Sequence, residues 1–338
     1  MITWRSKNLK IGLILNTRKN SSEFEVEYDP PHTVELIKTG IQNAGYEYVF
    51  IEADENVVEN IKLHKPDLVF NRSEGLKGES RESHIPAVLE MLGIPYVGSN
   101  ILTTSISLNK GWTKKILEFD EILSPKFLIA EKMSDIQNIE FHFPLILKPN
   151  EEGSSIGINE DNVVPNRAQL EKKLKEMLDY YKEPILIEEF IQGRELSVGV
   201  LGTHSGSFEV LSILEVDFKK FPHEIGNVFG QKAKTLFDDL DNYICPAIIT
   251  NRLKTEIENI TLKICKCLDI KDFARIDFRL NNNSELFFLE INPLPGMDFD
   301  LDSKDFSFYP YMSFKSGYTF DDLIKRLLDS AILRYGLK

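Results

Sequence analysis

The fold is decided by two apolar segments near the C-terminus, Phe273-Ala-Arg-Ile-Asp-Phe-Arg-Leu280 and Glu285-Leu-Phe-Phe-Leu-Glu-Ile291. A polar stretch, Asn281-Asn-Asn-Ser284, separates them. Short apolar runs on either side of such a turn indicate a pair of neighbouring β-strands. We therefore expect two adjacent strands whose side chains alternate between two faces.

Charged and amide side chains follow this alternation. Arg275 and Asp277 are two residues apart and share one face of the first strand, while Glu290 and Asn292 share one face of the second. A carboxylate inside the apolar run around Glu290 is costly unless it meets a cation. Oxygen donors from Asp, Glu and Asn suit magnesium bound together with phosphates. An ion pair between Glu290 and Arg275 explains the same spacing, and spacing alone leaves the two interpretations level.

Composition sets broad limits. A length of 338 residues predicts two or three domains, and 42% hydrophobic with 28% charged residues is typical of a soluble globular protein. The net charge of −13 argues against a general nucleic-acid binder. No apolar run has the length of a membrane span or, near the N-terminus, of a signal peptide. We expect a cytoplasmic protein without membrane or nucleic-acid partners. The three cysteines form no disulfide framework.

The N-terminal part alternates strand and helix patterns, which predicts a parallel sheet. Strands are expected at residues 11–15, 46–51 and 67–70, a strand or loop at 94–98, and helices at 33–44 and 83–92. Farther along, helices are expected at 105–119, 167–181, 251–268 and 319–335, and strands at 144–148, 185–189, 195–201 and 208–216. Residues 217–240 are charged and show no clear period, which is typical of a disordered or functional loop.

A glycine-containing loop follows one expected strand. Lys148 ends this strand and runs into residues 151–157, Glu-Glu-Gly-Ser-Ser-Ile-Gly. Glycines let a backbone approach a ligand closely, and successive N–H groups can cradle anionic oxygens. Ser154 and Ser155 add hydroxyl donors. An ordinary turn between strands explains the loop equally well when it is taken alone.

Two further features are weak in isolation. Backbone groups at the end of Ile185-Leu-Ile-Glu-Glu-Phe-Ile191 can bind an adenine edge, and Glu195 can accept hydrogen bonds from a ribose. Lys110 lies in an expected helix, where a lysine is normally solvated.

Together and in this order, the segments resemble the ATP-grasp fold and, within it, the D-alanine–D-alanine ligase family. The matching segments are Leu92-Gly-Ile-Pro-Tyr-Val-Gly-Ser99, Leu108-Asn-Lys110, Leu147-Lys-Pro-Asn-Glu-Glu-Gly-Ser-Ser-Ile-Gly157, Leu186-Ile-Glu-Glu-Phe-Ile-Gln-Gly-Arg-Glu-Leu-Ser-Val198, Ala274-Arg-Ile-Asp277 and Leu289-Glu-Ile-Asn-Pro-Leu-Pro-Gly-Met297. The resemblance implies an α/β protein with an N-terminal parallel-sheet substrate domain at residues 1–100. Two α+β subdomains, 101–198 and 199–338, would clasp ATP, the second carrying the metal site.

The resemblance also implies cofactors and roles: ATP, and Mg²⁺ for which Mn²⁺ can substitute. ATP would be bound by Lys110, Lys148, Ser154, Ser155, Glu188, Glu189, Ile191, Glu195 and Lys234. The metal would be held by Asp277, Glu290 and Asn292, and catalysis would use Arg275, Ser154 and Lys234. A substrate carboxylate would form an acyl phosphate with ATP, and an amine would attack it while Arg275 stabilises the oxyanion. Loops 151–157 and about 220–236 would act as lids.

The sequence departs from the family at the amino-acid pocket. A glutamate expected near the N-terminus has three candidates, Glu23, Glu25 and Glu27. The family's His-Gly becomes Glu74-Gly75, and the tyrosine after Lys234 becomes Thr235. The Ser-Leu-x-Pro that usually follows Pro-Gly-Met is missing. The candidate substrate residues are Glu74, Arg72, Thr235 and Gly296, with Arg81 as a further carboxylate partner; surface solvation is the competing interpretation for both arginines.

Conserved ATP-binding residues beside a changed pocket predict conserved chemistry on changed substrates. We expect a carboxylate–amine ligase for amino-acid-like or peptide-like molecules. Two alternatives stay open: a D-alanine–D-alanine ligase with unusual pocket residues, and a non-catalytic ATP-binding regulatory module. The resemblance also suggests a homodimer, for which the apolar helix at 83–92 could supply a surface, although its residues could equally be core.

Overall fold

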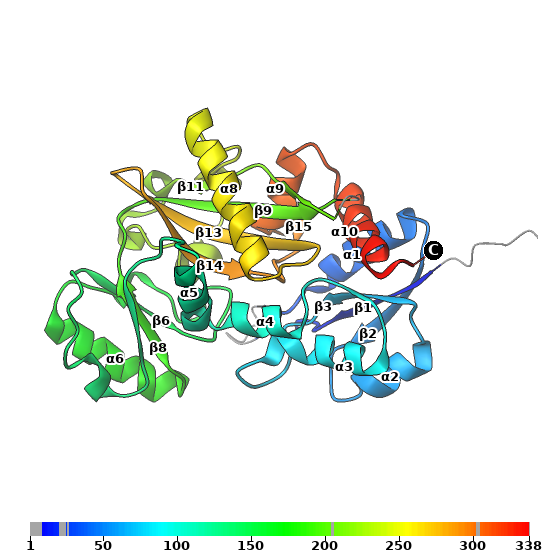
Figure 1. Ribbon diagram of the computed structural model, residues 1–338, viewed down its shortest axis with the longest axis horizontal. Helices are drawn as coiled ribbons and strands as arrows, with labels where there is room; N and C mark the ends of the chain where they lie inside the picture. Colours follow the sequence, from blue (N-terminus) through cyan, green and yellow to red (C-terminus); the bar gives the residue numbers. More distant parts are fainter. Residues whose placement is uncertain (1–8, 20–24, 26, 204–205, 302–304, 338) are drawn as a thin grey trace, which may run out of the picture.

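The computed structural model describes residues 9–337 except 20–24, 26, 204–205 and 302–304. Glu23 therefore lies outside the described residues. Three main sheets are arranged around the centre of the molecule (Figure 1). The N-terminal parallel sheet expected from the sequence is present, whereas the limits of the three domains stay a prediction.

The N-terminal sheet is parallel and has the order β2-β1-β3-β4. Its strands are β1 (Lys10–Leu15), β2 (Glu47–Glu52), β3 (Leu68–Arg72) and β4 (Tyr96–Val97), and its helices are α1 (Pro31–Asn43), α2 (Val57–His64) and α3 (His84–Leu92). Helices α2 and α3 cover one face; α1 and the C-terminal helix α10 (Phe320–Tyr335) cover the other (Figure 1). Gly40 lets α1 approach α10, because a Cβ there would lie 2.8 Å from a carbon of Ile324.

The central sheet is antiparallel and has the order β5-β8-β6-β7. Its elements are β5 (Phe127–Ala130), β6 (Leu145–Pro149), β7 (Val163–Val164), β8 (Ile185–Glu189) and the covering helix α6 (Arg167–Tyr181). Helix α6 buries Leu170, Leu174 and Met177, which the helical period places on one face.

Two helices, α4 (Ile101–Leu108) and α5 (Lys110–Phe119), connect the first two sheets. The single helix expected at 105–119 is therefore wrong. Asn109 has extended backbone angles, and its side chain caps α5 by accepting from the backbone N–H of Trp112. The break places Lys110 at the first position of α5.

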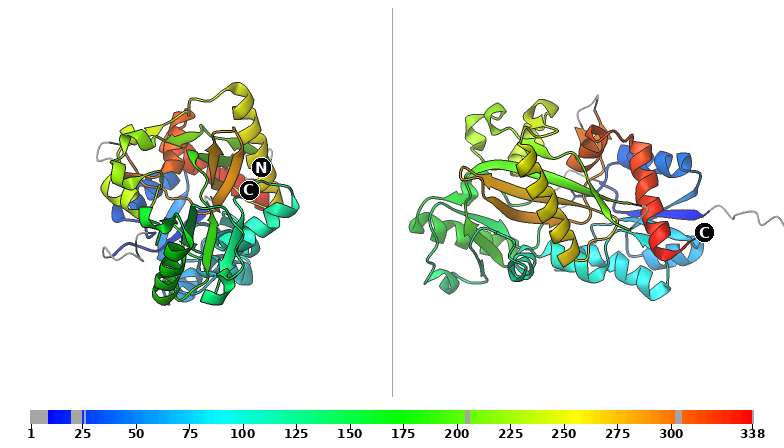
Figure 2. Two further views of the ribbon diagram at one scale, coloured as in Figure 1. Left: turned by 90° about the vertical axis from the view of Figure 1, so that its left-hand side faces the viewer. Right: turned by 45° about the horizontal axis from the view of Figure 1, so that its top comes forward.

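The largest sheet has the order β12-β11-β9-β13-β14, with β10 also paired to β9. Its strands are β9 (Gly193–Gly202), β10 (Phe208–Val210), β11 (Leu214–Val216), β12 (Tyr243–Ile244), β13 (Phe273–Asn281) and β14 (Leu286–Asn292). Helix α8 (Asn251–Cys267) crosses one face (Figure 2). The continuous strand expected at 208–216 is interrupted, because the backbone N–H of Ser212 donates to Ser316 Oγ.

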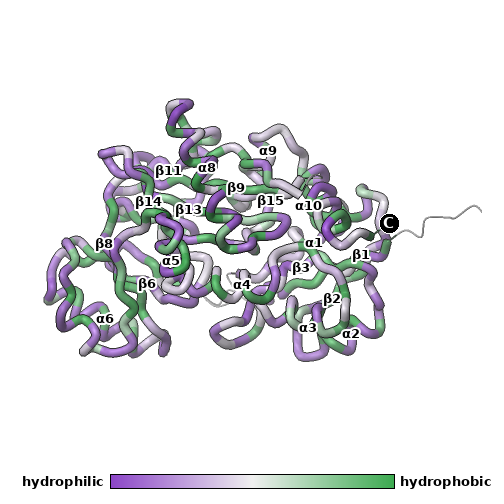
Figure 3. The backbone as a smooth tube through the Cα atoms, viewed as in Figure 1, coloured by the Kyte–Doolittle hydropathy of each residue, from purple (hydrophilic) through white to green (hydrophobic). Residues whose placement is uncertain are grey.

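Three helices escaped the sequence analysis: α2, α7 (Gln231–Leu236) and α9 (Phe308–Lys315). Helix α7 has only six residues and lies in the stretch that showed no period. Residues 309–313 of α9 are all buried, so no polar face marks this helix. A short hairpin, β15 (Phe299–Asp300) with β16 (Asp305–Phe306), precedes α9. Hydrophobic stretches follow the strands of the sheets (Figure 3). Among the described residues, none of the helices is both long and apolar enough to cross a membrane.

Candidate active site

A buried carboxylate joins two lysines between the central sheet and α5. Glu188 lies on β8, and its carboxylate lies 2.6 Å from Lys148 Nζ on β6 and 3.0 Å from Lys114 Nζ on α5. Lys114 is completely buried and was missed by the sequence analysis. Its spacing from Lys110 is one helical turn, which places both lysines on one face and could have revealed it.

Opposite charges determine the ionisation of this cluster. Burial alone would raise the pKa of Glu188, but the ammonium groups of Lys114 and Lys148 outweigh it and lower the pKa. Burial opposes the charge of Lys148 as well, yet the carboxylates of Glu188 and Glu290 raise its pKa overall. The pKa of the deeper Lys114 is lowered, with burial as the main cause. The cluster therefore keeps the ammonium group of Lys148 charged at the cavity wall.

The strand pair that opened the sequence analysis aligns its polar residues across from one another. Arg275 faces Asn292, and Asp277 faces Glu290. Asp277 accepts a 2.6 Å hydrogen bond from Ser197 Oγ, and its ion pair is with Arg275 at 2.9 Å. The ion pair between Glu290 and Arg275 that the spacing allowed is therefore wrong. Arg275 pairs instead with Asp277, its neighbour on the same face of β13.

Four cationic side chains act on the carboxylate of Glu290. Burial raises the pKa of its carboxyl, but Lys110, Lys148, Lys234 and Arg275 together lower it below the usual value. Two carboxylates at paired positions, with the amide of Asn292 beside them, form a hard-oxygen donor set that fits a magnesium ion.

A second ion pair closes the side of the site formed by β9. Glu195 and Arg279 lie opposite each other on β9 and β13, with 2.9 Å between Glu195 Oε2 and Arg279 Nη2. Burial raises the pKa of Glu195 and lowers that of Arg279. Arg279 was not foreseen as a site residue, although it continues the alternation of Arg275 and Asp277.

The two expected lids meet each other over the site. Ser155 Oγ donates to the carbonyl of Phe229 at 3.3 Å, and the N–H of Gln231 donates to the carbonyl of Ile158 at 2.8 Å. Ser154 and Ser155 both have positive φ angles, 47° and 61°. The neighbouring helix α7 carries Lys234 and Thr235.

Lys234 of α7 lies over the ring of Phe229, 5.2 Å from its centroid. Burial, followed by repulsion from Arg275, lowers the pKa of Lys234. Thr235 is exposed and hydrogen-bonds within its own helix, to the carbonyl of Gln231 at 2.9 Å.

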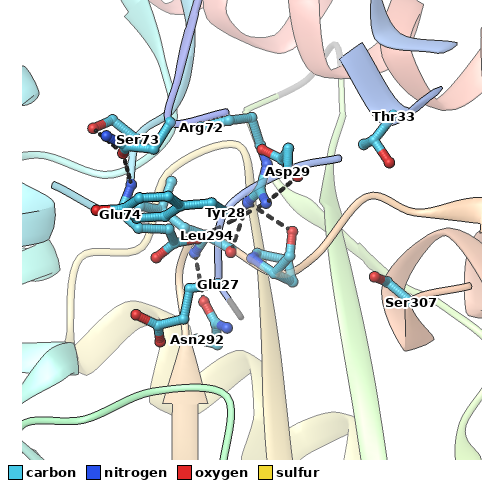
Figure 4. Close-up of polar contacts among 12 residues, drawn as sticks. Glu27, Tyr28, Asp29, Thr33, Arg72, Ser73, Glu74, Asn292, Leu294 and Ser307 are labelled. Atoms are coloured by element: carbon cyan, nitrogen blue, oxygen red, sulfur yellow. Dashed lines mark hydrogen bonds and ion pairs between the residues drawn. The ribbon is translucent and has the colours of Figure 1, made fainter. Parts of the chain in front are cut away.

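The N-terminal wall of the site is built around Arg72. Arg72 is 1% exposed, which contradicts the solvated-surface interpretation. Its guanidinium donates to the carbonyls of Leu294 (2.7 Å) and Pro295 (2.9 Å) and to Asp29 Oδ1 (3.3 Å), and lies 3.8 Å from Glu74 (Figure 4). Arg72 thus fixes the loop that follows the metal-site strand, and its role toward a substrate carboxylate stays a prediction.

Among the described residues, Glu27 is the N-terminal candidate glutamate that lines the cavity. It lies against the glycine loop, because a Cβ on Gly153 would be 2.2 Å from Glu27 Oε1. Arg81 Nη2 lies 3.0 Å from Glu27 Oε2 and 3.1 Å from Glu152 Oε2. Arg81 is therefore not a solvated surface residue either. Glu25 accepts from the N–H of Lys19 and does not line the cavity.

The residues assigned from the sequence to ATP, the metal and catalysis, together with Arg72, Glu74, Thr235 and Gly296, all line one cavity of about 460 Å³, whereas Arg81 is not among its lining residues. These include Glu189 and Ile191 at the expected adenine end and Gly296 at the expected acceptor end. A Cβ on Gly296 would lie 2.4 Å from Ser307 Oγ, so Gly296 makes room for a serine that the sequence analysis did not consider. The sequence predicted that these residues converge; their individual roles stay predictions.

Comparisons with known proteins agree with this geometry. Residues 116–329 match the family model described as the D-ala D-ala ligase C-terminus. A D-alanine–D-alanine ligase of Carboxydothermus hydrogenoformans is 32% identical, covering 95% of this chain and 97% of that protein. The chain belongs to the D-alanine–D-alanine ligase family. An uncharacterised protein of Sinorhizobium fredii, y4sG, is 31% identical over 88% of this chain and 87% of its own length.

The family assignment made from the sequence is confirmed, and with it an ATP-dependent ligase with the ATP-grasp fold. A solved D-alanine–D-alanine ligase from Bacillus anthracis, complexed with ATP, superposes with a TM-score of 0.74 at 23% identity, covering 97% of this chain and 99% of that one. At this identity the likeness supports the fold.

Proposed function

We propose that this ligase joins a carboxylate to an amine on amino-acid-like or peptide-like substrates, not necessarily on two D-alanine molecules. The observation that carries the proposal is the convergence of Lys110, Lys148, Lys234 and Arg275 on Glu290 in one cavity. Such a cluster of cations suits the phosphates of ATP and the charge that develops on a transferring phosphoryl group. ATP use also supports a cytoplasmic location.

The proposed reaction has two balanced steps. An oxygen of the substrate carboxylate attacks the γ-phosphorus of ATP, the bond to the β-phosphate oxygen breaks, and ADP leaves. The amine nitrogen of the second substrate attacks the acyl carbon, inorganic phosphate leaves, and the nitrogen loses a proton. Arg275, buried and fixed by Asp277, is positioned to stabilise the oxyanion. The meeting lids would keep water from the acyl phosphate.

Nucleotide contacts follow from the cavity lining. We propose that Lys110, Lys148, Ser154, Ser155 and Lys234 bind the phosphates. The carboxylate of Glu188 is fully engaged by two lysines, so its backbone would contact the adenine together with Glu189 and Ile191. Glu195 would hold the ribose, oriented by Arg279.

Asp277, Glu290 and Asn292 would hold magnesium, with manganese as a substitute. When bound, the ion would neutralise phosphate oxygens and orient the γ-phosphate for transfer. Arg275 and Ser197 fix the Asp277 carboxylate in advance, which reduces the rearrangement that metal binding requires.

The test is ADP release by the full chain with MgATP across D- and L-amino acids and small peptides, with products identified by mass spectrometry. We expect turnover with at least one pair other than D-alanine with D-alanine. Efficient turnover of D-alanine alone would restore the standard activity, which the names of several relatives favour. Tight ATP binding without turnover on every substrate would indicate the regulatory module instead. Retention of every expected phosphate lysine and metal ligand speaks against that alternative.

The oligomeric state is a separate proposal. Helix α3 buries Ile85, Pro86 and Leu89 in the N-terminal core, so most of its apolar side chains are occupied within the chain. Met91, 87% exposed, is the part of this helix that a homodimer could still use.

A further inference from the structure

The substrate end of the cavity is unusually acidic, and its acidity lies where the sequence departs from the family. Glu27, Asp29, Glu74 and Glu82 all line the cavity near the N-terminal sheet. Glu74 stands where the family has a histidine. At this position the wall therefore carries a carboxylate in place of a histidine.

Two guanidinium groups, those of Arg72 and Arg81, form ion pairs with the acidic wall. Arg72 pairs with Asp29 at 3.3 Å and only distantly with Glu74 at 3.8 Å. Arg81 is shared between Glu27 at 3.0 Å and Glu152, which adds a fifth carboxylate. Arg72 and Arg81 thus contact four of these carboxylates between them, and neither forms an ion pair with Glu82.

Glu82 has no hydrogen-bond or ion-pair partner among the described residues, although it is only 6% exposed. Glu82 lies in the short turn before α3, and this turn packs against α4. Burial, followed by repulsion from Glu27, raises the pKa of its carboxyl to about 8, and Arg81 and Lys110 offset this only in part. Glu74 shows the same direction, since burial and repulsion from Glu27 and Glu82 raise its pKa well above the usual value. A buried, unpaired carboxylate that faces a cavity is costly unless a cation meets it.

An independent observation also points to a ligand. The hydroxyl of Ser107, on α4, is buried without a hydrogen-bond partner in the described protein, and Ser107 lines the same cavity. Oδ2 of Asp29 is likewise buried without a partner there. Buried polar atoms of folded proteins nearly always have partners, so these atoms mark a place where a polar ligand completes the site.

We propose that one of the two joined molecules carries a second cationic group, as an amino acid with an ammonium or guanidinium side chain does. Glu27 would take one cationic group, and Glu74 with Glu82 would take the other. The proposal rests on the proposed ligase function and specifies its substrate class. An anionic or purely aliphatic side chain would leave Glu82 without a counter-charge, so the same wall selects against such substrates.

The experiment compares cationic amino acids with neutral analogues of similar shape: lysine with norleucine, ornithine with norvaline, and arginine with citrulline, each as D- and L-forms. ADP release is measured with the full chain and MgATP, with each amino acid alone and in pairs. We expect kcat/KM for a cationic amino acid to exceed that of its neutral analogue by at least tenfold. Equal or better turnover of the neutral analogues would overturn the proposal while leaving the ligase function intact.

Variants locate the effect. Glu82→Gln and Glu74→Gln should each reduce the preference for the cationic member at least tenfold, whereas Glu82→Asp, which retains the charge, should preserve most of it. Glu55→Gln, an exposed site in the same sheet domain, is the matched control and should leave the preference unchanged. An unchanged preference in both Gln variants would show that the two carboxyls are simply protonated and do not bind substrate.

A binding measurement distinguishes failure of the cationic-substrate proposal from failure of the proposed ligase function. The melting temperature of the wild-type protein is recorded with lysine or norleucine, without ATP. Stabilisation by lysine alone supports the proposal even if no amino acid releases ADP, in which case the ligase function would be the part that fails. Equal shifts with both amino acids, or none with either, would count against the cationic substrate.

Discussion

The buried cluster of Glu188, Lys114 and Lys148 provides the sharpest test of the site's construction. Glu188→Gln removes the carboxylate that both ammonium groups contact, at 2.6 and 3.0 Å, while nearly preserving the side-chain volume. Lys114 is fully buried, so water does not solvate its ammonium group. We expect Glu188→Gln to destabilise the protein by about 4 kcal/mol, because breaking one buried ion pair typically costs about 3–5 kcal/mol.

The magnitude is limited by the partners that remain. Lys114 keeps a 3.2 Å hydrogen bond to the carbonyl of Phe288, and Lys148 keeps its attraction to Glu290. Lys114→Met should cost less, about 3 kcal/mol, since Glu188 retains Lys148. The double variant, Glu188→Gln with Lys114→Met, should then lower the free energy of unfolding by well under the sum of the two single losses. Removing both charges leaves only Lys148 without its carboxylate partner.

The assay is urea unfolding followed by circular dichroism and tryptophan fluorescence, with free energies taken where the two probes coincide. Glu189→Gln is the matched control on the same strand: its carboxylate accepts a hydrogen bond from the exposed backbone N–H of His142, so we expect a loss below about 1 kcal/mol. A loss under about 1 kcal/mol for Glu188→Gln, or strict additivity in the double variant, would refute the proposed ion-pair network.

Four further predictions address other parts of the cavity. Burial raises the pKa of Glu82 from 4.5 to about 8, so its stabilising contribution is complete below pH 4.5 and is lost as the pH rises toward 8. Glu82→Gln should flatten the resulting fall in melting temperature of the ligand-free protein between about pH 5 and 8, and an unchanged slope would contradict this. Lys148→Ala should abolish substrate-dependent phosphate release from ATP, which a phosphate assay would show. Glu290→Gln should raise the magnesium concentration needed for half-maximal ADP release, roughly tenfold or more, because metal ligands and their immediate partners typically contribute 10–100-fold. Gly153→Ala should raise KM for the amino-acid substrate more than KM for ATP, since its Cβ would displace Glu27; equal effects would argue against that contact.

Local periodicity allowed the sequence to predict most of the regular elements. Alternation predicted that Arg275 and Asp277 share one face of β13 and that Glu290 and Asn292 share one face of β14, and the observed register brings the two pairs opposite each other. The same reasoning failed where the backbone departs from periodicity. At Asn109 a side-chain cap competes with helix continuation, and five consecutive residues of α9, 309–313, are buried, so neither leaves a periodic signal.

The partners of charged residues could not be predicted, because they come from distant parts of the chain. Arg72 binds the carbonyls of Leu294 and Pro295, more than 200 positions away, and Lys114 binds Glu188, 74 positions away. Solvation was the reasonable expectation for Arg72 and Arg81, since an arginine is normally exposed. Only the assembled fold shows that Arg72 is buried and Arg81 partly buried, both among carboxylates.

The position of Arg72 explains how substrate preference can change while the ATP chemistry is retained. Its guanidinium holds the backbone that follows Asn292 on one side and the acidic wall of Asp29 and Glu74 on the other. The metal-site strand is thus anchored through backbone carbonyls, which do not depend on the side chains opposite. Substitution of Glu74 changes the charge that a substrate meets without removing either backbone anchor. Changes on the acidic wall should therefore alter which molecules are joined more than the rate of phosphoryl transfer to a substrate that still fits.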